Sequence, residues 1–437
     1  MKEIKKEYLN SLLKEYMNDP IYSISRSALN KTKISDLVRV GEENANIQNH
    51  FSVDIDTMKV ANQKNSGRCW IFAGLNILRE KVAKKYNIEK FELSQNYIAF
   101  YDKLEKCNYF LDSIITLLDK DKDDRLLSFI LQRGIEDGGQ WDMFVNVVKK
   151  YGVVPQSVFA ETYQSENTRE IDNVLNRFLR KVAFKLRKCS SEDIDSIKDD
   201  AISKIYKLLC SSFGVPPKSF SFEFVDKDKK YNIIKDITPM DFLNNYIDID
   251  LDEYVSIINS PTSEKPFNKT YTVSYLGNVV EGKDILYLNL EMSRLKELSL
   301  LQLQNFEPVW FGSDCMKYGD RDKGFWDDKS FNEQDLLGLD LTMTKEEMLD
   351  TRESSMNHAM VLTGVNIDDS APNRWKIENS WGDEVADKGY YVATDTWFDN
   401  YVYQVVINKK YLNDEEKELL GLKPTILNPW DPMGTLA

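Results

Sequence analysis

One cysteine of this sequence has the surroundings of a nucleophile, in the segment NQKNSGRCW (62–70). Apolar residues recur at helical spacing after Cys69, which predicts a helix that starts close to this cysteine. Amide groups at a helix start stabilise a thiolate and lower its pKa. Gln63 can bring its side-chain amide to the same space as the Cys69 backbone N–H, and two such donors would form an oxyanion hole. Ser66 and Gly67 are small enough to let a substrate backbone approach. The alternative interpretation is a buried structural cysteine.

A base for this thiol must come from a small set, because the sequence contains only two histidines. His50 matches no other motif and is interpreted as structural. His358 opens the apolar segment HAMVLTGV and by itself would be interpreted in the same way. Asn379, in WKIENSWGDE, changes that interpretation, since its side-chain carbonyl could accept the imidazole N–H and fix the ring's tautomer and orientation. Trp381 could shield that hydrogen bond from water.

Composition limits the function classes that remain. Acidic residues outnumber basic ones by 71 to 57, giving a formal charge of −14, so nucleic acid is not an expected partner. The five cysteines are scattered and form no CxxC pair, which indicates reduced thiols and argues against a zinc site. No signal peptide or apolar stretch of about 20 residues is present, so we expect a cytoplasmic protein away from membranes. The five cysteines of the sequence are Cys69, Cys107, Cys189, Cys210 and Cys315.

The elements that must position these side chains change along the chain. Helical periodicity predicts an amphipathic helix over 3–19 that ends at Pro20, and further helices after Cys69, over 141–151, over 171–186 and over 194–209. From about residue 271 onward, short alternating segments predict an antiparallel sheet or barrel. Helices early and strands late indicate an α+β fold. The expected divisions are a core-packing extension (1–59), a helical part with the nucleophile (60–160), a helical insertion (161–265), a β-rich part with the histidine and asparagine (266–427) and a tail (428–437).

The chain order Gln, Cys, His, Asn resembles that of the papain superfamily. Within it, the segments QKNSGRCWIFAGLN, DGGQWDM, VWFGSD, MNHAM and ENSWG resemble the bleomycin hydrolase and bacterial aminopeptidase C group. The resemblance runs from about residue 60 to the C-terminus. Two departures from papain stand out. The first cysteine of papain's Cys-Gly-Ser-Cys is missing, as a reducing compartment would explain. Asn357 precedes His358 where papain has an acidic residue.

The resemblance implies a papain-like α+β fold of two lobes, a helical lobe and an antiparallel β-barrel-like lobe, with the helical insertion as an oligomerisation arm. It also implies a homohexamer, peptide substrates, and no cofactor or metal. The C-terminal tail would reach the active site, where its carboxylate meets the substrate amine. The substrate-binding residues implied are Gly67, Gly138, Gly139, Asn357, Trp381 and Ala437.

The expected activity is that of a cysteine aminopeptidase, with a bleomycin-type amide hydrolysis possible by resemblance. Cys69 would attack, His358 would act as base, Asn379 would orient it and Gln63 would bind the oxyanion. Two alternatives remain open. Cys-His acyltransferases usually orient the base with Asp, so Asn379 and Gln63 count against them. An inactive assembly protein would be expected to lose Cys69, His358 or Asn379, and all three are present.

Overall fold

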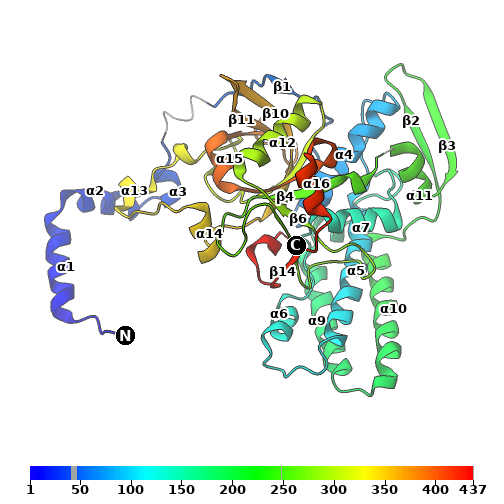
Figure 1. Ribbon diagram of the computed structural model, residues 1–437, viewed down its shortest axis with the longest axis horizontal. Coiled ribbons are helices and arrows are strands. Elements are labelled where there is room, and N and C mark those ends of the chain that lie inside the picture. Colours follow the sequence, from blue (N-terminus) through cyan, green and yellow to red (C-terminus); the bar gives the residue numbers. More distant parts are fainter. Residues whose placement is uncertain (41–46, 248, 437) are drawn as a thin grey trace.

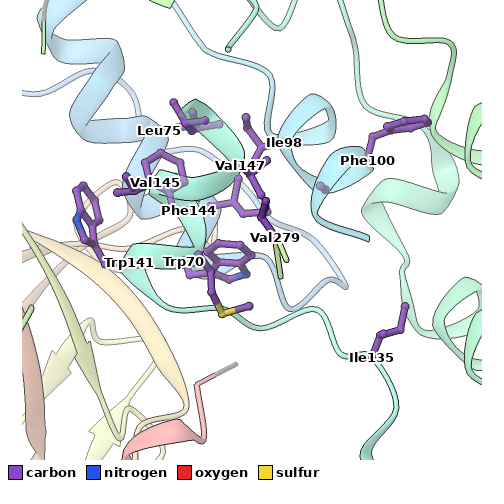
Figure 2. Packing of buried hydrophobic residues seen from close by; sticks show 14 of the residues in the cluster. Trp70, Leu75, Ile98, Phe100, Ile135, Trp141, Phe144, Val145, Val147 and Val279 are labelled. Carbon is purple, nitrogen blue, oxygen red and sulfur yellow. The ribbon is translucent and has the colours of Figure 1, made fainter. Parts of the chain in front are cut away.

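The computed structural model describes residues 1–40, 47–247 and 249–436. Its buried apolar residues form two clusters. The first lies mainly among the helices and includes Trp70, Phe100 and Phe144, part of which is drawn in Figure 2. The second lies mainly against the sheet and includes Val309, Leu362 and Trp375. The combination of helices and a large sheet confirms the expected mix of elements (Figure 1).

The helices around the first cluster start and end where local chemistry requires. The Asp124 side chain accepts hydrogen bonds from the first amides of the helix over 125–133. The Ser94 side chain accepts one from the Tyr97 amide at the start of the helix over 95–115. Gly152 has a φ of +73°, a conformation that suits glycine and ends the helix before it. The predicted helices after Cys69 and over 141–151 are confirmed. The helices of this part are α4 (Cys69–Lys85), α5 (Gln95–Ile115), α6 (Arg125–Arg133), α7 (Trp141–Tyr151), α8 (Tyr163–Glu166), α9 (Arg169–Leu186), η2 (Ser191–Asp193) and α10 (Ile194–Phe213).

The main sheet has twelve strands, and its register brings distant segments together. In antiparallel β10 and β7, His358 faces Ser313, and in β10 and β11, Val361 faces Glu378. Asn379, the residue after Glu378, therefore lies close to the start of β10. The strands are β1 (Val53–Asp54), β4 (Tyr254–Ile258), β5 (Lys269–Val273), β6 (Tyr287–Asn289), β7 (Val309–Ser313), β8 (Gly319–Asp320), β9 (Phe325–Trp326), β10 (His358–Asp368), β11 (Ala371–Glu378), β12 (Tyr390–Thr394), β13 (Val402–Asn408) and β14 (Thr425–Leu427).

The expectation of an antiparallel sheet was wrong in part, because three strand pairs are parallel. These pairs are β4 with β6, β5 with β14 and β9 with β12. Each joins strands that are separated by long stretches of chain, which a parallel pair requires. The remaining elements cover this sheet or connect its strands: α12 (Met292–Gln304), η5 (Asp328–Ser330), α13 (Glu333–Leu337), α14 (Lys345–Thr351), α15 (Asp395–Tyr401), η6 (Lys409–Tyr411), α16 (Asp414–Leu420) and η7 (Pro432–Gly434).

Residues 161–265 are not helical throughout, contrary to the expectation. After α10 the chain forms a hairpin of β2 (Phe220–Val225) and β3 (Tyr231–Ile237). The short elements α11 (Pro239–Phe242), η3 (Leu243–Ile247) and η4 (Leu251–Glu253) follow, and β4 already belongs to the main sheet. The alternation in FSFEFV is a strand signal that the sequence analysis did not use.

The N-terminal helix α1 projects away from the rest of the chain, whereas α2 and α3 lie near α13, where Tyr22 approaches Gly338 (Figure 1). These three helices are α1 (Lys6–Asn18), α2 (Pro20–Leu29) and α3 (Ile34–Leu37), and none of them has a buried residue. Pro20 ends α1 as predicted but also starts α2, where Asp19 accepts from the Ile21 amide at 2.9 Å. Within residues 1–59, burial against the core begins only with Val38 and continues at Ile55.

Candidate active site

Cys69 is the first residue of α4, and its side chain is buried among elements from both ends of the sequence. The Ala359 amide donates a hydrogen bond to its Sγ at 3.4 Å. Ala359 is the second residue of β10, directly after His358. The contact therefore brings the sulfur to the start of the strand that carries the histidine, across the 290 positions that separate Cys69 from Ala359.

The His358 ring is fixed by Asn379, at the end of β11. His358 Nε2 lies 2.8 Å from Asn379 Oδ1. The same oxygen accepts from the Ser380 amide at 2.7 Å, which identifies it as the carbonyl oxygen of the side chain. Since that oxygen can only accept, Nε2 carries the hydrogen, and Nδ1 of the neutral ring is left as the proton acceptor.

Trp381 covers the histidine. Its ring stacks on the His358 ring with centroids 5.1 Å apart and an interplanar angle of 27°. The side chains of Cys69 and His358 are both buried, to 4% and 5% exposure. An apolar cover of this kind excludes water from the hydrogen bond between His358 and Asn379, which strengthens that bond.

Gln63 is tied to the residue that follows Asn379. Ser380 Oγ donates to the side-chain oxygen Oε1 of Gln63 at 2.5 Å. The backbone amide of Gln63 donates to the Ser380 carbonyl at 2.8 Å. Gln63 Nε2 donates to the Ser66 carbonyl at 2.6 Å. An amide nitrogen carries two hydrogens, so one N–H of Gln63 remains for a further acceptor. The structure thus brings Gln63, Cys69, His358 and Asn379 together.

Burial sets the resting protonation of the pair. It raises the pKa of the Cys69 thiol to about 11, although the Ala359 and Trp70 amides act in the other direction. It lowers the pKa of His358 to about 4, and the bond to Asn379 opposes this. Both shifts favour the uncharged forms, a thiol and a neutral imidazole. A thiolate at Cys69 would lie at the start of α4, where the helix amides stabilise negative charge and oppose the effect of burial.

The loop before Cys69 is held by Asp137. The Gly67 amide donates to Asp137 Oδ2 at 2.8 Å, and Trp70 Nε1 donates to the Asp137 carbonyl at 2.7 Å. Lys103 of α5, only 2% exposed, donates to Asp137 Oδ1 at 2.5 Å and also bonds Asp172. Burial alone would raise the pKa of Asp137, but the Lys103 charge and these hydrogen bonds outweigh it and hold that pKa well below its usual range.

Gly138 and Gly139 follow Asp137 directly, so they lie beside the same loop. The Gly138 carbonyl accepts from Lys106 Nζ at 2.5 Å. A Cβ on Gly139 would lie 2.5 Å from the Trp70 ring, so only glycine fits there. The expected substrate-binding glycines therefore lie next to the nucleophile loop, where the chain can approach a ligand closely.

Asn357 lies next to His358 and is exposed. Its Nδ2 donates to Asp314 Oδ1 at 2.5 Å, and its Oδ1 accepts from the Cys315 amide at 3.1 Å. These bonds fix the side chain at the end of β7. His50, by contrast, lies away from this group of residues, and its carbonyl accepts from the exposed Arg374 side chain.

The C-terminal tail enters the space between the glycine segment and the histidine strand. Gln140 Nε2 donates to the Met433 carbonyl at 3.5 Å, next to Gly139. Thr435 Oγ1 donates to the Met356 carbonyl at 2.8 Å, two residues before His358. The tail thus contacts both sides of the candidate site.

The last described residue, Leu436, is buried at 4% exposure. Ala437, expected to carry the carboxylate that meets the substrate amine, lies outside the described residues.

Sequence reasoning missed three supporting residues. Ser380 stands inside the ENSWG segment and Asp137 directly before the two glycines, so both could have been found in the motifs. Lys103 gives no such signal, because a buried lysine within a helical pattern looks like an exposed one.

No described helix is both long and apolar enough to span a bilayer.

Several known proteins resemble this chain over most of its length. The profile of the Peptidase C1-like family matches residues 3–434. Aminopeptidase C from Lactobacillus delbrueckii subsp. lactis is 44% identical over 444 residues, covering 100% of this chain and 99% of the relative. Bleomycin hydrolase from Gallus gallus is 40% identical and covers 88% of each chain. The crystal structure of PepW from Lactobacillus rhamnosis HN001 is 44% identical, with a TM-score of 0.97 over 100% of this chain and 99% of that one.

Proposed function

The chain belongs to the Peptidase C1-like family and is a cysteine peptidase with a papain-like fold, and from this premise we propose that it releases residues from peptide N-termini through Cys69, His358 and Asn379. The observation that carries the proposal is the contact of Cys69 Sγ with the Ala359 amide, next to a histidine whose Nε2 is held by Asn379. A nucleophile, a base and a group that orients the base are what acyl transfer needs.

In the proposed mechanism, the Cys69 proton passes to His358 Nδ1 and the thiolate attacks the first peptide carbonyl. The resulting oxyanion accepts hydrogen bonds from the Cys69 backbone N–H and the free N–H of Gln63. His358 gives its proton to the departing amine as the C–N bond breaks. The neutral ring then takes a proton from water, which attacks the thioester and frees Cys69.

Gln63→Ala tests the oxyanion assignment. Loss of one oxyanion donor typically lowers kcat by about 100- to 1000-fold. We expect that loss with a preserved fold, measured by circular dichroism. A variant with near-parent kcat would show that Gln63 does not bind the oxyanion.

Alkylation of Cys69 tests the pair itself. Iodoacetamide should label Cys69 in the parent protein, and mass spectrometry of the digest locates the label. His358→Ala should abolish rapid labelling, because the thiol then has no neighbouring base. Equal labelling rates in the two proteins would contradict the assignment. Cys107 is an internal control, because burial raises the pKa of its thiol.

We further propose that the C-terminal carboxylate selects the substrate's free amine. Supporting this, Pro432, Met433, Gly434 and Leu436 are buried, and the tail contacts both sides of the site. A variant lacking the last few residues should lose trimming from the N-terminus and gain internal cleavage. An unchanged product pattern by mass spectrometry would contradict the role of the tail and leave the catalytic residues as proposed.

A bleomycin-type amide is a second substrate that follows from the same chemistry, supported by the relative from Gallus gallus. The proposed attack needs only an amide carbonyl beside a free amine. Incubation with bleomycin should release ammonia from its terminal amide, and Cys69→Ser should not do so.

We propose a homohexamer, with the N-terminal helices among its contacts. Exposed apolar residues are frequent on α1 and α2, and a soluble chain usually covers such residues with a partner. Light scattering should give a mass six times that of the chain, and Leu9→Ser with Leu13→Ser should lower it. The exposed apolar residues are Tyr8, Leu9, Leu12, Leu13, Met17, Ile21, Tyr22 and Ile24.

The two apolar clusters correspond in this proposal to two lobes, with the candidate active site between them. All five cysteines have free thiols, which supports residence in the reducing cytoplasm.

A further inference from the structure

We propose that Arg321 makes this peptidase prefer peptides with an acidic group directly after the cleaved bond. The inference rests on the proposed function and adds the substrate class on the side of the departing amine. It concerns one arginine at the rim of the site, which none of the sequence motifs include.

The position of the departing amine follows from the mechanism. His358 must donate its proton to the new amine, so the peptide after the cleaved bond has to leave along the histidine side of the site. The ring of Trp381 covers that side, stacked 5.1 Å from the His358 ring. Side chains that reach Trp381 are therefore next to the departing segment, while Gly138 and Gly139 lie beside the loop before Cys69.

Arg321 reaches Trp381. Its guanidinium carbon lies 5.0 Å from the centroid of the Trp381 ring, within the range of a cation–π contact. This contact orients the guanidinium while leaving its N–H donors free for a carboxylate. Arg321 is exposed, and no carboxylate of the described residues lies within 4.0 Å of it.

The backbone at Arg321 is fixed. Tyr391 donates from its hydroxyl to the Arg321 carbonyl at 3.0 Å. Asp320 Oδ1 accepts from the amides of Asp322 and Lys323 at 3.1 and 3.0 Å. The other oxygen of Asp320 pairs with Arg39 at 2.5 Å, so this carboxylate does not compete for Arg321. A free cation on a fixed turn loses little conformational entropy when it binds an acid.

The other charges near the turn are of both signs: Asp322, which directly follows Arg321, is exposed, and its amide rather than its carboxylate bonds to Asp320. Asp383, close to Trp381 in the sequence, is already paired with Lys59 at 3.0 Å. Lys323 is a second exposed cation of the same turn, but it makes no contact with Trp381 among the described ring contacts.

The test compares two peptides, Leu-Glu-Ala-amide and Leu-Gln-Ala-amide, which differ only in one charge. An exposed ion pair stabilises by up to about 1 kcal/mol, so the parent protein should cleave the Glu peptide with a kcat/KM about 2- to 5-fold higher. Arg321→Gln should bring the ratio to about 1 while kcat/KM for the Gln peptide stays unchanged. The matched control, Lys323→Gln, should keep the parent ratio. Added salt should reduce the parent ratio.

An Arg321→Gln ratio equal to that of the parent would overturn the inference, as would an equal loss in Lys323→Gln. A fall in kcat/KM for both peptides in Arg321→Gln would mean that Arg321 acts by packing on Trp381, which also overturns it. If the parent protein cleaved neither peptide, the proposed function itself would fail.

Discussion

Two buried networks of charged residues contact the segments that carry the candidate site, and they differ in which residues make their ion pairs. In the first, Lys103 lies between Asp137 and Asp172 and holds the loop before Cys69. In the second, Arg79 of α4 pairs with Glu378 at 2.8 Å, both 1% exposed, directly before Asn379. One network supports the nucleophile and the other supports the residue that orients the base.

The protonation of the two networks differs accordingly. The Lys103 charge holds Asp137 ionised across the usual pH range. Burial raises the pKa of Glu378 to about 7, and Arg79 opposes this only in part. Burial also raises the pKa of Asp172, the second acid of the first network, to about 6, although Lys103 opposes this. The contrast is therefore between Asp137 and Glu378. A carboxylate that receives a backbone amide and a lysine stays charged, whereas a strand carboxylate deep between helix and sheet titrates near neutrality.

Lys103→Met should break the first network with the largest effect. It leaves Asp137 and Asp172 buried without their cation, and removing one partner of a buried pair costs about 3–5 kcal/mol. Urea unfolding at pH 7.5 measures the loss. Lys204→Met is the control, because Lys204 pairs with Asp200 at the exposed surface of α10. A loss below about 1 kcal/mol would mean that the two acids do not need Lys103.

Glu378→Gln sharpens the comparison through pH. Because folding raises the pKa of Glu378 from 4.5 to about 7, its protonated form stabilises the fold below pH 4.5, and this contribution is lost as pH rises to about 7. At 1.36 kcal/mol per pKa unit, the parent should lose up to about 3 kcal/mol relative to the variant across this window. Unfolding titrations at pH 4.5, 6 and 8 measure the difference. A difference independent of pH would contradict the raised pKa.

Thr168→Val should give the smallest effect. The Thr168 hydroxyl donates to Asp137, and a hydrogen bond to a charged group contributes about 1.5 kcal/mol or somewhat more. The Cys69 alkylation rate should fall only slightly, since Lys103 and the Gly67 amide still hold Asp137. Thr351→Val serves as control, because it removes a bond between the exposed Thr351 hydroxyl and a carbonyl of its own helix.

Much of the site could be predicted because each residue's chemistry is visible in its own segment. Cys69 precedes a helical pattern, and with two histidines in the sequence the base had few candidates. The bond between His358 and Asn379 was predicted from the residue types alone, and the structure contains it.

The supporting networks could not be predicted in the same way, because they depend on packing between distant elements. Lys103 meets Asp137 and Asp172 only when α5 lies beside two later segments. Arg79 meets Glu378 across 299 positions. The hairpin of β2 and β3 is a different case, since its alternating FSFEFV pattern was available in the sequence and the surrounding charged helices masked it.

The N-terminal helix α1 has a further consequence for measurements in dilute solution. Its 13 residues bury nothing in the single chain, and isolated helices of about 12–15 residues are marginal in water. Its helical content must then depend on mass action with whatever covers it. Spectra recorded at nanomolar and at micromolar protein should differ in amplitude even though every other helix of the body is unchanged.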